Sequence, residues 1–249
     1  MTRPIACVTG ASSGLGRDIA LALASWGWDV AIGARRAGAL EETAELIRKA
    51  GGRAVVAKLD LRDPESIDGF VARAFDELGP VSALINNAGV SNIGALDIQD
   101  VDEIAEAVET NLVAPMLVSR ATVRHWGESV PPNATIVFIS SMSAVEPTPH
   151  MLGYCASKAG LEQFAKGLRL ELRPRGIRVI SMRLGSIETP FRSNLPQERL
   201  GPMLEAWKRA GIPLVHRVRM NPATVAETIV SALAAPLGAY LDEFQLNPQ

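Results

Sequence analysis

A tyrosine and a lysine stand four residues apart at Tyr154 and Lys158, and Ser141 lies thirteen residues before the tyrosine. On a helix, side chains at positions i and i+4 share a face, so the Lys158 ammonium can sit beside the Tyr154 phenol. A free phenol has a pKa of about 10, and a fixed neighbouring cation lowers that pKa. Such a tyrosine can exchange a proton with an alcohol oxygen near neutral pH. The pair alone is equally typical of an ordinary amphipathic helix, so the rest of the chain has to decide between these interpretations.

A glycine-rich turn follows the first apolar run of the chain. Residues 5–9 are strand-like, residues 15–26 carry apolar side chains at helical spacing, and three glycines lie around the junction. Glycine lets a backbone approach a ligand closely, and a helix N-terminus offers free N–H groups to a pyrophosphate. The spacing Gly-x-x-x-Gly-x-Gly differs from the common Gly-x-Gly-x-x-Gly fingerprint. Its position favours a nucleotide site over a turn made for packing alone, with contacts at Gly10, Ser12, Ser13, Gly14, Leu15 and Gly16.

The end of the second apolar run bears on which dinucleotide would bind. A site that prefers NAD usually has an acidic residue there, which holds the ribose 2′-hydroxyl. This chain has Arg35 and Arg36 instead, and no acid beside them. One charge-assisted hydrogen bond to a 2′-phosphate is worth about 1.5–3 kcal/mol, roughly a ten- to hundredfold preference. The sequence therefore predicts NADP(H), with two solvated arginines at a helix start as the alternative.

Composition excludes several other functions. The net charge is −2 with 21% charged residues, and no basic block predicts binding to nucleic acid or to an anionic membrane. No apolar run approaches the roughly 18 residues of a membrane span, and the first strand begins by residue 5, so we expect a cytoplasmic protein without a signal peptide. Cys7 and Cys155 could pair, but two free thiols are favoured. The three widely spaced histidines predict no metal site.

Short apolar runs alternate with longer helical patterns along the chain. Strands are expected at residues 5–9, 29–34, 54–59, 81–85, 134–139 and 177–182, and helices at 15–26, 39–50, from 64 onward, 101–126, 161–172 and 225–234. Asp63 is the expected N-cap of the helix that starts at Pro64. Continuously apolar strands are typical of a parallel sheet buried on both faces. The repeated strand–helix order predicts an α/β protein with a doubly wound, mostly parallel, Rossmann-like sheet and helices on both faces.

One domain is expected to span residues 1–249. Its irregular part is residues 185–221, which are rich in proline, arginine and methionine. A segment of this length inside a compact domain is usually a binding loop or lid, so we predict a substrate lid there, with a disordered surface loop as the alternative.

Taken together, four motifs resemble those of the short-chain dehydrogenase/reductase family, in order and over roughly residues 4 to 190. They are the turn from Thr9 to Gly16, the run 86–89 (Asn-Asn-Ala-Gly), the set Ser141, Tyr154 and Lys158, and Asn111. The resemblance implies an oxidoreductase that moves a hydride between NADP(H) and a ketone or secondary alcohol. It also implies further cofactor contacts at Asp60, Leu61, Asn87, Ala88, Gly89, Tyr154, Lys158, Gly185, Ile187 and Thr189.

The family's catalytic roles map onto four residues. Tyr154 would be the general acid in reduction and the general base in oxidation. Lys158 would lower the tyrosine pKa and hold the nicotinamide ribose. Ser141 would hydrogen-bond the substrate carbonyl, and Asn111 would hold a water that links Lys158 to solvent. Ser140 is the competing serine, but the family's spacing selects Ser141, and strand alternation points the two side chains in opposite directions.

The chain departs from the family pattern at two places. Leu184-Gly185 replaces the usual Pro-Gly after the sixth strand, and residues 239–246 lack the usual Asp-Gly-Gly-like ending, although a strand there stays compatible with the sequence. Specificity is expected from Ser143, Glu146, His150, Met151, Phe191, Met203 and Trp207. The lid region also carries Arg192, Arg199, Arg209, Arg217 and Arg219, which indicate either an anionic substrate or, preferably, a solvated face.

Three functions are compatible with these observations. A carbonyl reductase or secondary-alcohol dehydrogenase explains the complete set of four catalytic residues. An NADP(H)-binding redox sensor would not need that set, and a sugar-nucleotide epimerase or dehydratase is usually longer than 249 residues. The substrate stays open among alkyl or cyclic ketones, β-ketoacyl thioesters and sugar ketones. Helices 101–126 and 154–172 are expected to pair in a homodimer or homotetramer.

Overall fold

The computed structural model describes residues 3–192, 195–212, 218–235 and 241–248. Within them, a seven-stranded sheet has the order β3-β2-β1-β4-β5-β6-β7, and every strand pair is parallel. The strands are β1 (Ile5–Thr9), β2 (Asp29–Ala34), β3 (Ala54–Lys58), β4 (Ala83–Asn86), β5 (Thr135–Ser141), β6 (Arg178–Leu184) and β7 (Glu243–Leu246). From β1 the chain adds β2 and β3 on one side of the sheet and then β4 to β7 on the other, which makes the sheet doubly wound. The predicted α/β, doubly wound, Rossmann-like fold is confirmed.

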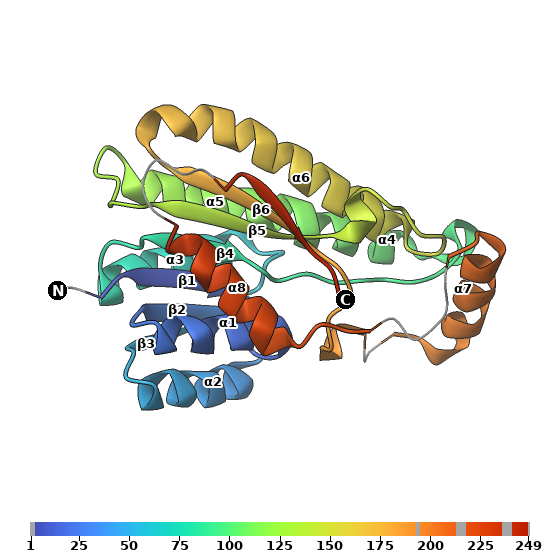
Figure 1. Ribbon diagram of the computed structural model, residues 1–249, viewed down its shortest axis with the longest axis horizontal. Coiled ribbons are helices and arrows are strands. Elements are labelled where there is room, and N and C mark those ends of the chain that lie inside the picture. The colour runs from blue at the N-terminus through green and yellow to red at the C-terminus, as the bar shows by residue number, and fades with distance from the viewer. Residues whose placement is uncertain (1–2, 193–194, 213–217, 236–240, 249) are drawn as a thin grey trace.

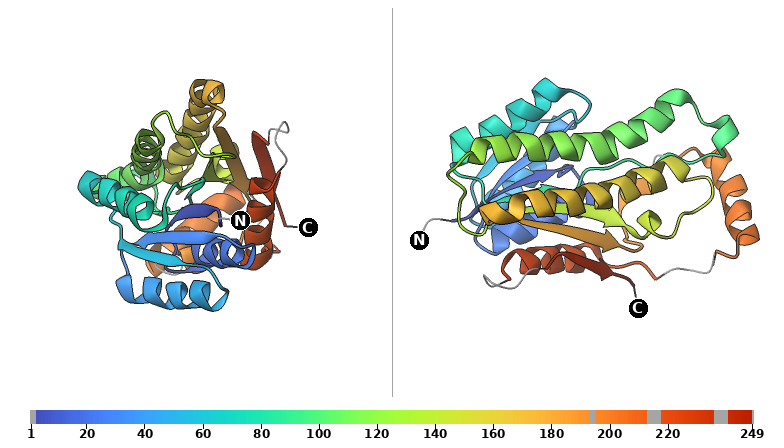
Figure 2. Two further views of the ribbon diagram at one scale, coloured as in Figure 1. Left: turned by 90° about the vertical axis from the view of Figure 1, so that its left-hand side faces the viewer. Right: turned by 90° about the horizontal axis from the view of Figure 1, so that it is seen from above.

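Helices cover both faces of this sheet, as the two views in Figure 2 show. On one face lie α1 (Gly14–Ser25), α2 (Ala37–Lys49) and α8 (Pro222–Leu233). On the other lie α3 (Pro64–Leu78), α5 (Ala114–Trp126) and α6 (Leu152–Leu172). The strands β1, β2, β4, β5 and β6 are apolar at most positions and almost wholly buried, whereas the edge strands β3 and β7 are partly exposed. This burial on both faces explains why the strands lack the alternation of a half-exposed sheet.

The helix expected over residues 101–126 is wrong as a single regular element. The chain forms α4 (Val101–Val108), a π turn (Glu109–Val113) and then α5. Pro115 stands in the first turn of α5 and has no N–H, so the regular hydrogen bond to the carbonyl of Asn111 cannot form. Proline thus accounts for an interruption at this point, and π turns are frequent at functional sites.

Two further helices differ from expectation. The helix expected at 161–172 begins nine residues earlier as α6 (Leu152–Leu172), so Tyr154 and Lys158 lie in its first two turns. The segment 185–221, expected to be irregular, contains α7 (Gln197–Arg209), which lies beyond the carboxyl edge of the sheet in Figure 1. Met203 and Trp207 bury one side of α7 and stabilise it despite the internal Pro202.

The other elements follow the sequence pattern to within three residues. Asp63 caps α3 as predicted, since its carboxylate accepts a hydrogen bond of 3.0 Å from the Glu65 amide. The C-terminal strand is confirmed as β7, although residues 239 and 240 of the predicted tail lie outside the described part. Cys7 and Cys155 are both free and buried, as favoured. No helix in the described residues is long and apolar enough to cross a membrane.

Candidate active site

A cleft of about 1230 Å³ lies at the carboxyl edge of the parallel sheet. Parallel α/β sheets place ligands at this edge, close to the point where the strand order reverses. Nearly all the predicted site residues line the cleft: Gly10, Ser12, Ser13, Gly14, Leu15, Gly16, Arg35, Arg36, Asp60, Leu61, Asn87, Ala88, Gly89, Ser141, Tyr154, Lys158, Gly185, Ile187 and Thr189. Asn111 is the one predicted site residue that does not line it, because it is completely buried.

The turn between β1 and α1 requires its glycines. Gly10 and Gly14 have φ angles of 72° and 54°, in the left-handed region that favours glycine. Gly16 is crowded, since a Cβ there would lie 2.4 Å from both the Gly10 carbonyl oxygen and Nδ2 of Asn87. The backbone thus forms a cradle at the N-terminus of α1, where N–H groups and the helix dipole favour an anion.

Strand β1 also holds the turn that follows β4. The hydroxyl of Thr9 accepts hydrogen bonds of 3.1 Å from the amides of Asn87 and Ala88, and Nδ2 of Asn87 donates to the Thr9 carbonyl at 2.9 Å. A Cβ on Gly10 would lie 2.8 Å from Cα of Ala88, so the two turns touch. Thr9 therefore holds the turn after β4 in place, a role that the sequence did not indicate.

The two arginines after β2 sit at the entrance to this cradle. Arg36 donates hydrogen bonds to the hydroxyls of Ser13 and Ser12, at 2.6 and 3.1 Å. Arg35 is exposed and also lines the cleft. Asp60 lies on the adjoining wall, where one of its carboxylate oxygens accepts from the Arg62 amide at 3.0 Å. Two cations and two hydroxyls thus gather where the strand–helix turn faces solvent.

Tyr154 and Lys158 point from α6 into the other half of the cleft. Tyr154 is 8% exposed and Lys158 is 4% exposed. The Lys158 ammonium donates a 2.8 Å hydrogen bond to the Ile139 carbonyl and lies 5.9 Å from the centre of the Tyr154 ring. Burial lowers the pKa of Lys158 to about 8, and the charge of Glu162 acts in the opposite direction. The Lys158 ammonium therefore lies close to the Tyr154 ring, as the sequence predicts.

The two serines at the end of β5 have different partners. The Ser140 hydroxyl is buried and donates to Oε1 of Glu162 at 2.7 Å. The Ser141 hydroxyl accepts a 3.2 Å hydrogen bond from the Ser143 amide and stays at the cleft wall. Of the two, Ser141 keeps a hydroxyl hydrogen that it can donate to a ligand.

Asn111 lies behind this wall, at the π turn. Its Oδ1 accepts from the Val90 amide at 2.8 Å, and its Nδ2 donates to the Val90 carbonyl and to the Ser157 hydroxyl at 2.9 and 3.1 Å. The amide therefore joins the loop after β4 to α6. A Cβ added to Gly89 would lie 3.0 Å from Oδ1 of Asn111 and 3.7 Å from Nζ of Lys158, so the three residues are close neighbours.

The C-terminal residues form part of the cleft, which sequence reasoning missed. Gly185 donates its amide to the Leu246 carbonyl at 2.8 Å. A Cβ at Gly185 would approach Oδ1 of Asn247 to 2.9 Å and Cδ of Pro248 to 3.0 Å. Asn247 and Pro248 line the cleft beside Ile187. Gly185 is thus required by the tail that packs on it, whether or not a proline precedes it.

The predicted lid meets the cleft through its two ends. Met220 pairs with Ile187 in an isolated parallel bridge, and the Tyr154 and Phe191 ring centres are 6.0 Å apart. Of the specificity candidates, Ser143, Glu146 and Phe191 line the cleft. Met151, Met203 and Trp207 instead pack in a buried apolar cluster under Tyr154, and His150 lies outside the cleft wall.

The lid arginines that the structure describes have different surroundings, and Arg219 is the one of them that lines the cleft. Arg199 makes an ion pair with both carboxylate oxygens of Glu103, at 2.7 and 2.8 Å, and donates to the Ile93 carbonyl at 3.1 Å. Its charge is therefore neutralised, and it fastens α7 to α4. Arg209 and Arg219 are exposed. Arg217 lies outside the described residues, as does the side chain of Arg192.

This sheet and cleft are typical of dinucleotide-binding proteins of the α/β class. A model of the short chain dehydrogenase family matches residues 4–200, and the chain belongs to that family. The resemblance read from the four motifs is thereby confirmed. Members are oxidoreductases that act on CH–OH or carbonyl groups with a nicotinamide cofactor.

Named relatives span several substrates. Glycine betaine reductase of Emericella nidulans is 33% identical over 245 residues, which are 98% of this chain, although the chain spans 19% of that much longer reductase. A variant of actinorhodin polyketide ketoreductase, crystallised with NADPH, superposes with a TM-score of 0.85 at 30% identity, over 99% of this chain and 96% of that one. An alcohol dehydrogenase of Thermococcus sibiricus, complexed with 5-hydroxy-NADP, gives 0.84 at 25% identity, over 99% and 97%.

Proposed function

We propose that this protein transfers a hydride between NADP(H) and a ketone or secondary alcohol, with Tyr154 as the general acid and base. The observation that carries the proposal is one cleft that is lined both by the glycine cradle and by Ser141, Tyr154 and Lys158. An oxidoreductase needs both a cofactor site and a proton donor at the reacting carbon, and this cleft supplies residues for both.

The residues present fit a dinucleotide. A Cβ at Gly10 or Gly16 would meet Ala88, Asn87 or the Gly10 carbonyl, so these glycines keep the turn tight, and Arg35 and Arg36 line the cleft beside it. The pyrophosphate would bind to Gly10, Ser12, Ser13, Gly14, Leu15 and Gly16, and the 2′-phosphate to Arg35 and Arg36. The adenine would lie against Asp60 and Leu61, and the adenosine ribose against Asn87, Ala88 and Gly89. The nicotinamide carboxamide would contact Gly185, Ile187 and Thr189. When bound, the cofactor supplies or accepts the hydride. Both structural neighbours are complexes, one with 5-hydroxy-NADP and the other with NADPH, which supports this preference.

Tyr154 would give its proton to the carbonyl oxygen as the ketone is reduced, and take it back in the reverse direction. Ser141 would donate a hydrogen bond to the same oxygen and so orient the carbonyl. Lys158 stays mostly protonated near neutral pH, since its pKa of about 8 is lowered by burial but remains above 7. Its charge therefore stabilises the phenolate that remains after proton transfer.

Asn111 would act through the peptide rather than through its amide side chain. The side chain is already engaged with Val90 and Ser157, whereas Pro115 cannot donate to the Asn111 carbonyl. We propose that this carbonyl holds the water that connects Lys158 to solvent. Homodimer or homotetramer formation and a cytoplasmic location stay predictions.

The direct test is turnover with a panel of carbonyl compounds. We expect the protein to oxidise NADPH, followed by absorbance, with at least one neutral alkyl or cyclic ketone. NADP⁺ should be reduced with the matching secondary alcohol. A mixture without ketone is the control. If NADPH binds tightly but no ketone, ketoacyl thioester or sugar ketone turns over in either direction, the sensor function would replace this proposal.

Cofactor preference tests the two arginines. Arg35→Ala and Arg36→Ala should each weaken NADPH binding by about ten- to hundredfold and leave NADH binding nearly unchanged, because each removes a charge-assisted contact that only the 2′-phosphate can make. Fluorescence titration gives both dissociation constants. Arg48→Ala is the matched control, since Arg48 lies on α2, the helix that begins directly after Arg36, and pairs with Glu41 outside the cleft. Equal losses for NADPH and NADH would remove the arginines from this role.

A further inference from the structure

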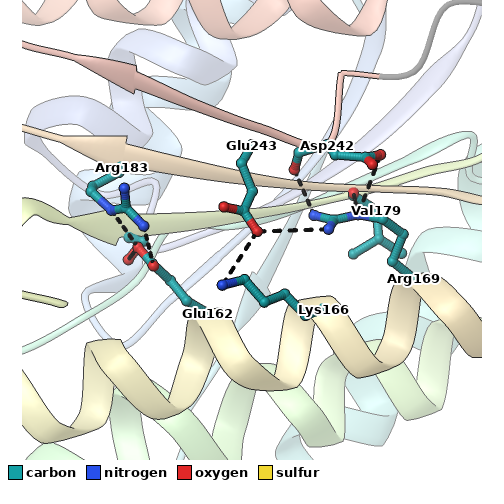
Figure 3. Close-up of polar contacts among 8 residues, drawn as sticks. Glu162, Lys166, Arg169, Val179, Arg183, Asp242 and Glu243 are labelled. Carbon is teal, nitrogen blue, oxygen red and sulfur yellow. Dashed lines mark hydrogen bonds and ion pairs between the residues drawn. The ribbon is translucent and has the colours of Figure 1, made fainter. Parts of the chain in front are cut away.

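A buried carboxylate lies directly behind the catalytic wall. Glu162 is one helical turn after Lys158 on α6 and is 6% exposed. Arg183 of β6 grips it with two hydrogen bonds, from Nη2 to Oε2 at 2.5 Å and from Nε to Oε1 at 3.0 Å, as Figure 3 shows. None of the four catalytic roles uses this pair.

The same carboxylate reaches the end of β5. Ser140 donates to Oε1 of Glu162 at 2.7 Å, and Ser140 directly precedes Ser141. Glu162 thus connects three elements at one point: the strand that carries Ser141, the helix that carries Tyr154 and Lys158, and β6. A shift of this carboxylate would change the spacing between the serine and the tyrosine.

Glu162 is ionised in this setting. Burial raises the pKa of its carboxyl group, but hydrogen bonds from Arg183 and Ser140 and the positive charges nearby outweigh burial and hold the pKa below its usual value. A buried ion pair is weak evidence for stability, because apolar residues of similar volume often stabilise a protein equally well. The place of this charge, four residues from a buried ammonium, is therefore the informative feature.

The surroundings of the two groups are otherwise sparse in charge. Around Lys158 lie the neutral side chains of Tyr154 and Asn111 and the Ile139 carbonyl. Around Glu162 lie Ser140 of β5, Arg183 of β6, Lys166 of α6 and Glu243 of β7. Glu243 is itself 3.7 Å from both Lys166 and Arg169 (Figure 3), so its charge is compensated. Glu162 is the one described carboxylate that contributes to the charge balance of Lys158.

We propose that Glu162 is a positioning residue of this active site: it supplies the buried negative charge one helical turn from Lys158, and it ties Ser140 to α6 so that Ser141 and Tyr154 keep their spacing. Arg183 pairs with Glu162: it holds the carboxylate in place and partly offsets its negative charge. The inference rests on the proposed function for its consequence in catalysis, and its electrostatic part can be measured without turnover.

The expected signs differ between the two partners. Glu162→Gln removes an anion and leaves the Arg183 cation uncompensated, and both changes favour the neutral form of Lys158. Arg183→Met leaves the anion and removes a cation, which favours the charged form. A pair with a merely structural role would give the same result whichever partner is lost.

The titration of Lys158 provides the test. Lysine labelled with ¹³C at Cε gives five signals, because the other lysines of the chain are Lys49, Lys58, Lys166 and Lys208. Lys158→Met assigns the signal of interest by its absence. We expect Glu162→Gln to move the titration midpoint of Lys158 down by about one pH unit. Arg183→Met should move it up, and the double variant should return it toward the wild-type value.

A second buried ion pair offers the matched control. Asp29, at the start of β2 and hence at the opposite edge of the sheet, is 2% exposed and pairs with Arg53 and Arg3 at 2.7 and 3.0 Å. Asp29→Asn should lower the melting temperature but leave the Lys158 midpoint in place. If Arg183→Met does not fold, Glu162→Gln and the double variant still decide the question.

Turnover adds a second readout. In ketone reduction the alkaline limb of the kcat/KM profile should move to lower pH in Glu162→Gln, because the Tyr154–Lys158 pair loses its first proton earlier. A folded Glu162→Gln protein with an unmoved Lys158 midpoint would overturn the inference. Absence of turnover in the wild type would contradict only the proposed function, since the titration uses no substrate.

Discussion

Replacing Tyr154 with phenylalanine should lower kcat for ketone reduction by about 10²- to 10⁴-fold and leave NADPH affinity nearly unchanged. The range is the usual contribution of a positioned general acid. The substitution deletes one oxygen and keeps the ring, which packs beside Phe191 and in the apolar cluster with Met151 and Trp207. The fold and the cofactor cradle should therefore survive while the proton donor is lost.

Steady-state kinetics at saturating NADPH and a fluorescence titration of NADPH separate the two effects. Tyr240→Phe makes the same chemical change at the other tyrosine of the sequence and should keep wild-type kcat. Ser141→Ala should fall between the two, because it removes a hydrogen bond to the carbonyl but no proton donor. A Tyr154→Phe enzyme that keeps more than about a tenth of wild-type kcat is incompatible with general acid catalysis by this residue.

The parts of the fold that follow from local sequence were predictable. Continuously apolar strands such as Ile5–Thr9 are typical of the middle of a parallel sheet that is buried on both faces. The glycine turn, the 86–89 run and the Tyr154–Lys158 spacing each come from residues close together in the chain. Parallel topology then brings their ends to one edge, which is why short motifs predicted nearly the whole cleft wall.

The features that the sequence did not predict depend on contacts between residues that are far apart in the chain. Pro202 and Gly201 disfavour a helix, so the sequence did not predict α7. The helix is stabilised because Trp207 is buried and donates a hydrogen bond to the Pro149 carbonyl at 2.8 Å. The pairing of Arg199 with Glu103 spans 96 positions, and nothing local to either residue indicates it. Asn247 reaches the cleft only because β7 pairs with β6.

Glu162 illustrates the same limit inside the site. Its spacing from Lys158 was visible in the sequence, but a glutamate on a helix is usually solvated. Its burial depends on Arg183 and Ser140, which come from two strands that are remote in sequence and neighbours in the sheet. The signal that could have found it is the arginine at position 183, which directly follows the predicted strand 177–182 and so lies at the same edge of the sheet as the predicted site.

Gly16→Ala should weaken NADPH binding by about five- to 150-fold and lower the melting temperature. The new Cβ would lie 2.4 Å from the Gly10 carbonyl oxygen and from Nδ2 of Asn87, so the turn or α1 must move. Overpacking of this kind costs about 1–3 kcal/mol, and about 2.7 kcal/mol corresponds to a hundredfold change in affinity. The displaced groups are the ones that would face the pyrophosphate, so the strain acts on the cofactor site itself.

Thermal unfolding with and without NADPH, together with a binding titration, measures both effects. Gly69→Ala is the control, because Gly69 lies within α3 and a Cβ there meets no atom within 4 Å. It should raise stability by about 0.5–1 kcal/mol, since alanine is the better helix former, and leave NADPH affinity unchanged. At saturating NADPH, kcat of Gly16→Ala should fall far less than in Tyr154→Phe, because the substitution leaves the proton donor in place. Wild-type affinity in Gly16→Ala would mean that the cradle is not where the pyrophosphate binds.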